Sequence, residues 1–87
     1  MFSKHLVYIL ESERNGRLYI GCTDNLEQRI KDHNAGKVTS TKGYIPYRLV
    51  HYEEFGNKTI ARKRELFFKT GKGRRVIKNI ISDGEVA

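Results

Sequence analysis

Two short apolar stretches near the start of the chain predict β-strands. Residues 5–11 and 17–23 are rich in β-branched, aromatic and aliphatic side chains, the composition that strands favour. The dipeptide Asn15-Gly16 between them is typical of a tight turn. Strands joined by so short a turn pair antiparallel, so the chain is predicted to open with a β-hairpin.

The segment after the hairpin, residues 25–34, has apolar positions at helical spacing and predicts an amphipathic helix. Asp24 is placed to cap its first turn, with Glu27 at the position that completes a capping box. Gly36 stands just beyond its last turn, where glycine often ends a helix. Residues 36–46 are polar and rich in turn-forming residues, which predicts a surface loop.

The second half of the chain predicts one more strand and two more helices. Residues 47–55 have the composition of a strand. Asn57 is placed to cap a helix that runs to about Thr70, where Gly71 is expected to stop it. Residues 74–81 carry four aliphatic side chains at helical spacing and predict a short third helix.

The predicted order ββαβαα defines a small α/β (α+β) domain, with a three-stranded antiparallel sheet flanked by helices. A chain of 87 residues fits one domain of this kind. We expect residues 1–82 to form it and residues 83–87 to be a disordered tail.

The charge of the chain favours a polyanionic partner. It holds 17 Lys and Arg against 10 Asp and Glu, a formal net charge of +7. Such a charge attracts nucleic acid, but it is shared by many proteins that bind nucleic acid without sequence preference, so it does not decide the function alone.

The chain has one cysteine and one short apolar run. Cys22 has no partner for an intrachain disulfide, which suits a reducing compartment. The apolar run at residues 6–10 ends at Glu11 and is too short for a secretory signal or a membrane span. We therefore expect a cytoplasmic protein with no membrane partner.

Two tyrosines of the hairpin are predicted to share one face of the sheet. A loop of residues 13–16 would pair Tyr19 with Leu10, diagonally across from Tyr8. Two phenols at that spacing can share a phosphate or a water. Packing against the sheet, the usual role of strand tyrosines, is the alternative.

Arg29 and His33 lie four residues apart on the first predicted helix, on the side that faces the sheet. There Arg29 can bind a phosphate and His33 can transfer a proton. The alternative is a basic pair at the edge of an apolar stripe that is satisfied locally.

Glu65 is the only acid between Glu54 and Asp83 and lies among cations at the edge of an apolar helix stripe. An acid in such a setting is either a ligand for a hard cation or an ordinary ion-pair partner. A thiol nucleophile formed by Cys22 and His33 is less favoured than a structural cysteine.

These residues together resemble the GIY-YIG nuclease family. The segments Leu6-Val7-Tyr8 and Tyr19-Ile20-Gly21 are similar to its paired motif, and Arg29, His33 and Glu65 resemble its arginine, histidine and metal-binding glutamate. The similarity runs from about residue 6 to residue 81. It is closest to small single-domain members akin to the N-terminal nuclease domain of an excinuclease in bacterial DNA repair.

The resemblance implies an endonuclease that hydrolyses DNA phosphodiester bonds in repair or recombination, with a single Mg²⁺, or alternatively Mn²⁺, held by Glu65. It implies a monomer as the working state. The catalytic residues it implies are Tyr8, Tyr19, Arg29, His33 and Glu65. The cations expected to contact DNA are Lys37, Lys42, Lys69, Lys72, Arg74 and Arg75.

Two positions depart from the family pattern, because Leu6 replaces the first motif glycine and only Asn79 corresponds to a late asparagine. Two other functions stay open beside the nuclease. One is a binding module that kept the fold and the basic surface without turnover. The other is a basic scaffold for structured RNA.

Overall fold

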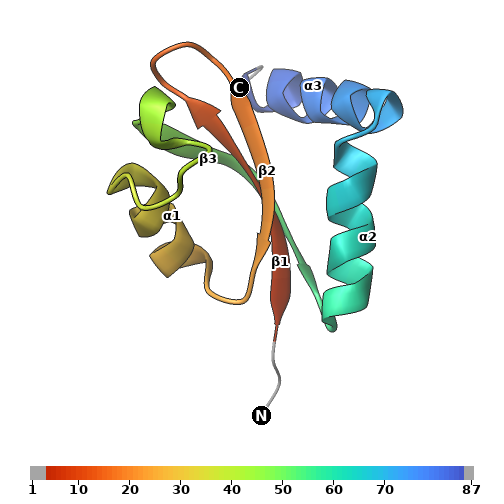
Figure 1. Ribbon diagram of the computed structural model, residues 1–87. Helices are drawn as coiled ribbons and strands as arrows, with labels where there is room; N and C mark the ends of the chain where they lie inside the picture. Colours follow the sequence, from red (N-terminus) through yellow and green to blue (C-terminus); the bar gives the residue numbers. More distant parts are fainter. Residues whose placement is uncertain (1–3, 86–87) are drawn as a thin grey trace.

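The computed structural model describes residues 4–85 and shows a three-stranded antiparallel sheet with helices on both faces (Figure 1). The predicted order ββαβαα is confirmed, with one short 3₁₀ helix added in the loop before the third strand. The elements are β1 (His5–Ser12), β2 (Leu18–Thr23), α1 (Leu26–Asn34), η1 (Lys42–Tyr44), β3 (Tyr47–Phe55), α2 (Lys58–Phe68) and α3 (Gly71–Glu85).

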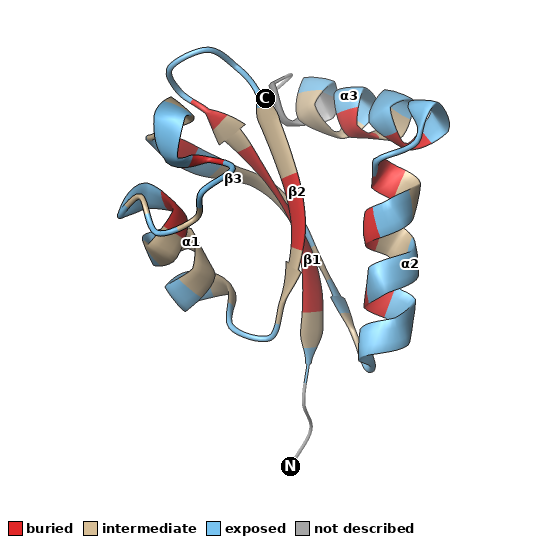
Figure 2. Cartoon of the chain, viewed as in Figure 1, coloured by how far each residue is buried: buried red, intermediate tan, exposed pale blue. Residues whose placement is uncertain are grey.

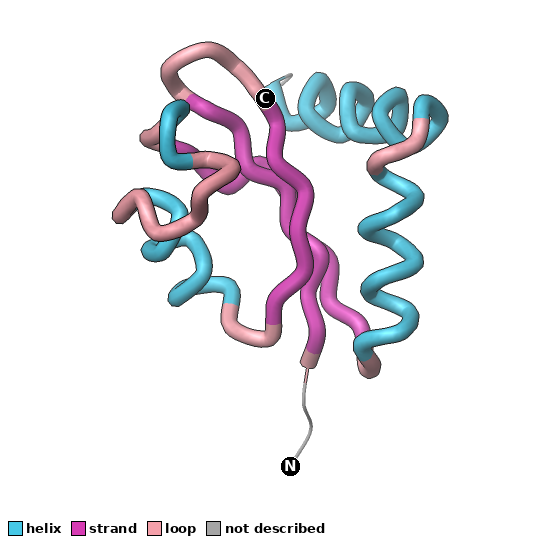
Figure 3. The backbone as a smooth tube through the Cα atoms, viewed as in Figure 1, coloured by secondary structure: helices cyan, strands magenta, loops and turns pink. Residues whose placement is uncertain are grey.

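The first strand is the centre of the sheet, whose order is β2-β1-β3. Five consecutive residues of β1 are buried, and Figure 2 shows this buried stretch between the helices. The hairpin register pairs Leu10 with Tyr19 and Tyr8 with Gly21, as the parity of the turn predicted. Because β2 pairs only with β1, it is an edge strand, and Figure 3 shows its backbone running beside β1.

The two faces of the sheet carry separate apolar cores. Val7, Ile9 and Ile20 pack under α2 and α3 against residues that include Phe68. Tyr8, Leu10 and Tyr47 form the second cluster, which packs against the apolar side chains of α1 on the opposite face. Alternate residues of one hairpin thus serve both cores, as period-two alternation requires. Figure 1 shows α1 on one side of the sheet and α2 with α3 on the other.

The first helix is capped one residue later than predicted. Asn25, not Asp24, is the N-cap, and its side-chain oxygen accepts from the Gln28 N–H at 3.2 Å. The Thr23 hydroxyl accepts from the Asn25 N–H at 3.1 Å, which fixes the turn that places Asn25 at the cap. The predicted capping box is therefore wrong. Gly36, with φ of +77°, stands beyond the end of α1 as expected.

The junction between α2 and α3 also differs from the prediction. Asn57 caps α2 as expected, accepting from the Ile60 N–H at 2.8 Å, but α2 ends at Phe68. Gly71 starts α3 instead of stopping α2. The reason is Thr70, whose hydroxyl accepts from the Gly73 N–H at 3.0 Å and so caps the new helix.

The third helix spans Gly71–Glu85 and is longer at both ends than the predicted 74–81. The predicted disordered tail at 83–87 overlaps this helix at 83–85, and residues 86 and 87 lie outside the described residues. Within residues 4–85, no helix combines the length and the apolar character needed to cross a membrane.

Arg64 lies on the apolar side of α2, where the sequence suggests no partner for a cation. The structure supplies one on β3, because the Arg64 Nε–H donates to Glu53 at 2.7 Å. The guanidinium also stacks 4.4 Å from the Phe68 ring centroid. Burial raises the pKa of Glu53, but hydrogen bonds from Arg64 and His51 outweigh it and leave the pKa lowered. The pair joins α2 to the far strand of the sheet.

Candidate active site

The hairpin places two tyrosines side by side on the α1 face. Tyr8 comes from the central strand and is fully buried, whereas Tyr19 comes from the edge strand and is half-buried. Their ring centroids are 6.1 Å apart. The predicted shared face is confirmed, and Tyr19 is the member that reaches the surface.

The first helix adds a cation and an imidazole to the tyrosines. Arg29 Nε–H donates to the Tyr8 hydroxyl at 3.3 Å. The same hydroxyl lies 2.9 Å from His33 Nε2. Tyr19 packs on His33 in an edge arrangement with centroids 4.6 Å apart. Four of the five candidate residues therefore form one contact cluster.

The electrostatics of this cluster fix its protonation near neutral pH. Burial raises the pKa of Tyr8 to about 12, although the hydrogen bond from Arg29 opposes the shift. Burial, followed by the nearby charge of Arg29, lowers the pKa of His33. The hydrogen bond to Tyr8 raises the pKa of Arg29, which stays charged. The cluster thus holds a protonated phenol beside a neutral imidazole.

A residue that sequence reasoning missed completes the cluster from the loop. The hydroxyl of Thr41 lies 2.8 Å from His33 Nδ1, and Thr41 is 1 % exposed. Residues 36–46 read only as a polar surface loop, so no pattern marked one hydroxyl of that loop as buried. The signal lies in the tertiary fold, which returns the loop across the end of α1.

Gly21 gives Tyr8 the room to reach the cluster. A Cβ atom at Gly21 would lie 2.5 Å from the Tyr8 hydroxyl and 2.9 Å from Tyr19 Cε2. Real Cβ atoms do not approach other atoms so closely, so both rings depend on the missing side chain. The last glycine of the second motif therefore has a steric role in the site.

Replacing Gly21 with Ala should displace Tyr8 and lower the free energy of unfolding by about 1–3 kcal/mol, the usual range for overpacking a core. Urea unfolding of the two proteins measures the difference. Gly43→Ala is the control, because a Cβ there meets nothing within 4 Å. Equal losses in both variants would show that the tyrosines do not need the space above Gly21.

Glu65 is not in contact with this cluster, which corrects the expectation that all five residues converge. It belongs to α2 on the opposite face, beside Cys22 of the edge strand. The carboxylate is buried and pairs with Lys69 at 3.0 Å and with Arg62 at 3.5 Å. β2 thus separates Glu65 from the tyrosines.

One oxygen of Glu65 is unsatisfied, which bears on the metal that the resemblance implies. Oε1 is buried and has no hydrogen-bond partner among the described residues, since Arg62 at 3.5 Å is too distant for a good bond. No group of three or more His, Cys, Asp or Glu residues able to hold a metal occurs within residues 4–85. The donor set fits Mg²⁺ bound by one carboxylate, with water and substrate as the other ligands.

Cys22 and His33 cannot form a thiol–imidazole pair, because they face opposite sides of the sheet. Cys22 packs with the α2 and α3 core, and His33 lies in the α1 cluster. Burial, followed by the charge of Glu65, raises the pKa of the Cys22 thiol. A thiol in this environment is a poor nucleophile.

An open pocket of about 340 Å³ lies at the end of β2 and joins the two sides of the edge strand. Arg29 enters it from α1 and Lys58 from the start of α2. The other lining residues are His5, Cys22, Thr23 and Asp24. A chain that follows the edge strand would meet side chains from both faces here.

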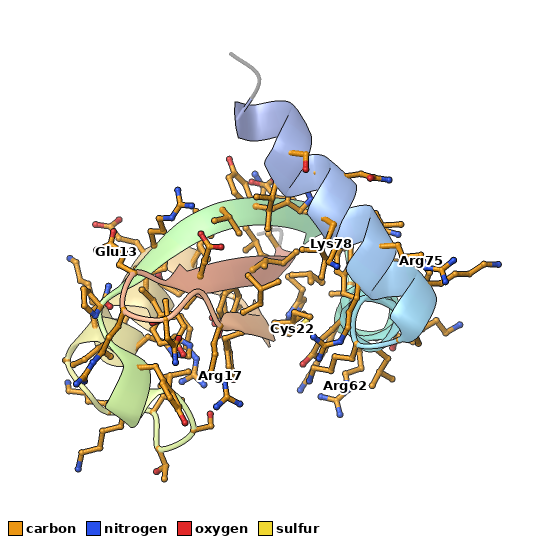
Figure 4. All side chains as sticks on the ribbon, turned by 90° about the horizontal axis from the view of Figure 1, so that it is seen from above. Glu13, Arg17, Cys22, Arg62, Arg75 and Lys78 are labelled. Carbon is orange, nitrogen blue, oxygen red and sulfur yellow. The ribbon has the colours of Figure 1, made fainter. Side chains whose placement is uncertain are left out.

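The cations predicted to bind DNA fall into two exposed groups on opposite sides of the sheet. Lys37 and Lys42 lie in the loop beside α1. The second group, at the α2–α3 corner, is Lys69, Lys72, Arg74 and Arg75. Figure 4 shows two cations that sequence reasoning missed, Arg17 and Arg62, on the side where Cys22 and the edge strand lie.

The two departures from the family pattern also find their places. Leu6 is buried in β1 between Thr23 and Glu54 of the neighbouring strands, so a side chain replaces the motif glycine within a regular ladder. Asn79 is exposed on α3.

Comparisons with known proteins agree with this fold and site. The GIY-YIG catalytic domain matches residues 4–78, so the chain belongs to this family, whose members are nucleases. It is 43 % identical over 79 residues to a UPF0213 protein of Staphylococcus haemolyticus, covering 90 % of this chain and 95 % of that one. It is 47 % identical over 64 residues to a UPF0213 protein of Clostridium perfringens, covering 72 % and 68 %.

A solved structure shows the same arrangement. The solution NMR structure of a UPF0213 protein from Bacillus halodurans superposes with a TM-score of 0.55 at 34 % identity. The match covers 88 % of this chain and 84 % of the other.

Proposed function

We propose that this protein is an endonuclease that hydrolyses DNA phosphodiester bonds and uses a divalent cation, Mg²⁺ in the first instance. The observation that carries the proposal is the hydrogen-bonded set of Arg29, Tyr8 and His33, which joins a cation to a proton relay. Phosphodiester hydrolysis needs charge neutralisation on the phosphate and a base for the attacking water.

The proton relay uses Tyr8 and His33 in sequence. The Tyr8 phenol, with its raised pKa, is a weak base only if its own proton can leave at the same time. Neutral His33 provides the acceptor at Nε2, 2.9 Å away. As Tyr8 takes a proton from water, it passes its own proton to His33, the water oxygen bonds to phosphorus and the bond to the leaving oxygen breaks.

Arg29 controls access to Tyr8, which is fully buried in the free protein. The guanidinium donates to the phenol, a neutral acceptor. A phosphate oxygen is a stronger acceptor, because a hydrogen bond between two charged groups is about twice as strong as a neutral one. Binding of the scissile phosphate would therefore draw Arg29 from Tyr8 and open the hydroxyl to water.

Glu65 would hold the cation at its unsatisfied Oε1. When bound, Mg²⁺ supplies positive charge to a phosphate oxygen and acidifies a bound water. Lys69 and Arg62 keep Glu65 ionised and oriented before the cation arrives.

DNA is expected to lie along β2, where the edge strand is flanked by α1 on one side and α2 on the other. There the backbone could meet Arg29 from one face and Glu65 from the other, with the pocket beside Lys58 between them. Arg17 and Arg62 add charge along the same side. Phosphate contacts of this kind hold DNA without reading its sequence.

Incubation of the purified protein with plasmid, single-stranded and branched DNA, in Mg²⁺ or in EDTA, tests the proposal. Cleavage that needs Mg²⁺ supports the nuclease. Binding without cleavage on any substrate would identify a non-catalytic binding module. Tight binding of structured RNA with no effect of metal would identify an RNA scaffold.

Replacing Lys37 and Lys42 with Ala together should weaken DNA binding equally for all sequences. The salt dependence should flatten by about one unit of slope for each phosphate that the protein no longer binds. Titrations at several salt concentrations measure the slope. Lys4→Ala with Lys78→Ala is the matched control, because it removes the same charge, and Lys4 pairs with Glu54 on β3. An unchanged slope in the first double variant would remove the loop from the DNA interface.

A further inference from the structure

The side chain of Thr41 has one hydroxyl hydrogen and two neighbours that can use it. Its hydroxyl donates to the carbonyl oxygen of Val38 at 3.3 Å. The same oxygen lies 2.8 Å from His33 Nδ1. With the Thr41 hydrogen directed to Val38, the short contact is satisfied only when Nδ1 carries a hydrogen and donates it to Thr41.

The other ring nitrogen of His33 then has one possible role. A neutral imidazole carries one hydrogen, so a protonated Nδ1 leaves Nε2 as an acceptor. Tyr8 Oη lies 2.9 Å from Nε2 and can donate into it. Tyr8 still accepts from Arg29 on a lone pair. Each polar group in the series Arg29, Tyr8, His33, Thr41 and Val38 is satisfied in this arrangement.

Burial makes Thr41 the partner that decides the tautomer. His33 is 0 % exposed and Thr41 is 1 % exposed, so bulk water cannot replace the hydroxyl at Nδ1. The loop that carries Thr41 is held in place, because the Asn34 side chain accepts from the Tyr47 N–H at 2.7 Å and donates to its carbonyl at 3.1 Å. The Thr41 N–H also donates to Val38 at 3.1 Å.

We propose that Thr41 is a positioning residue for the cleavage reaction, because it holds His33 in the tautomer with hydrogen on Nδ1 and so reserves Nε2 to receive the Tyr8 proton. The opposite tautomer would place a hydrogen between His33 and Tyr8 and block the relay. The catalytic consequence rests on the proposed nuclease function. The tautomer itself does not, since it exists in the free protein.

The tautomer is measured directly by ¹⁵N NMR of the two His33 ring nitrogens, without DNA or metal. The wild type is expected to show a protonated Nδ1 and an unprotonated Nε2. A wild type with hydrogen on Nε2 would overturn the proposal whatever the cleavage assay shows.

Thr41→Val removes the hydroxyl and nearly keeps the shape. Loss of a buried acceptor is worth roughly tenfold or more in the tautomer ratio, so His33 should shift toward the form with hydrogen on Nε2. Cleavage should fall by a similar factor, with DNA affinity unchanged. Wild-type tautomer and wild-type cleavage rate in a folded Thr41→Val protein would overturn the proposal.

Thr41→Ser and Thr39→Val separate positioning from folding. Serine keeps the hydroxyl, so it should restore both the wild-type tautomer and the cleavage rate. Thr39 is exposed in the same loop, and its replacement should leave both unchanged. If Thr41→Val does not fold, the Thr41→Ser protein and the wild-type spectrum still decide the matter, because a serine variant with hydrogen on Nε2 and full activity would contradict the role. If no protein cleaves DNA while His33 carries hydrogen on Nδ1 in the wild type, the positioning stands and the nuclease proposal fails.

Discussion

Glu65→Gln is expected to lower cleavage by about two orders of magnitude or more, because it removes the carboxylate that would bind the cation. Glutamine keeps the size of the side chain and its place on α2. The fold should persist, since the ion pairs with half-exposed Lys69 and exposed Arg62 contribute no more than about 1 kcal/mol. DNA binding should persist or tighten, because one negative charge leaves a basic surface.

Single-turnover cleavage in Mg²⁺, DNA binding in EDTA and urea unfolding together test this result. Glu27→Gln is the matched control, because Glu27 also pairs with a lysine one helical turn on, with Lys31 at 3.5 Å, but lies exposed on α1. The control should cleave at the wild-type rate. A Glu65→Gln protein that also cleaves at the wild-type rate would leave Glu65 as an ion-pair partner only and remove it from the reaction.

The hairpin shows how much of this site the sequence could predict. Antiparallel pairing and the length of the turn decide the register, so Tyr8 and Tyr19 could be placed on one face from parity alone. Helical spacing placed Arg29 and His33 on the side of α1 that meets them. These relations are local, because each depends on one turn or one helix and its packing face.

Relations between distant segments could not be predicted in the same way. Helical spacing places Glu65 on the buried side of α2, but the face of the sheet that α2 covers depends on how the chain returns after β3. The contact between Thr41 and His33 depends on the path of an eleven-residue loop with no periodic pattern. Arg64 likewise needs Glu53 on a different element before its place in an apolar stripe can be explained.

The helix caps illustrate a smaller error of the same kind. Asp24 and Asn25 are adjacent, and both residue types favour N-cap positions. The hydrogen bond from Asn25 to the Thr23 hydroxyl selects the second. At the other junction, Gly71 suggested a helix end, but Thr70 at the preceding position caps a new helix.

The strongest effect on folding is expected at Gly73, which sets the approach of α3 to the end of α2. Gly73 is buried, and a Cβ there would lie 2.6 Å from both the carbonyl carbon of Phe67 and the Cα of Phe68, and closer still to the Phe67 carbonyl oxygen. These are backbone atoms of α2 and cannot rotate away, unlike a flexible side chain. Relief requires the two helices to separate, with loss of the packing between them.

Gly73→Ala should therefore lower the free energy of unfolding by about 3 kcal/mol, at the upper end of overpacking effects. For a domain of this size, that corresponds to a fall in Tm of more than about 10 °C. Gly71→Ala is the control two residues away in the same helix, because a Cβ there meets nothing within 4 Å. It should be neutral or slightly stabilising, since alanine favours the helical state over glycine. Thermal and urea unfolding of the two variants measure the contrast, and equal stabilities would show that α2 and α3 do not require the close approach at Gly73.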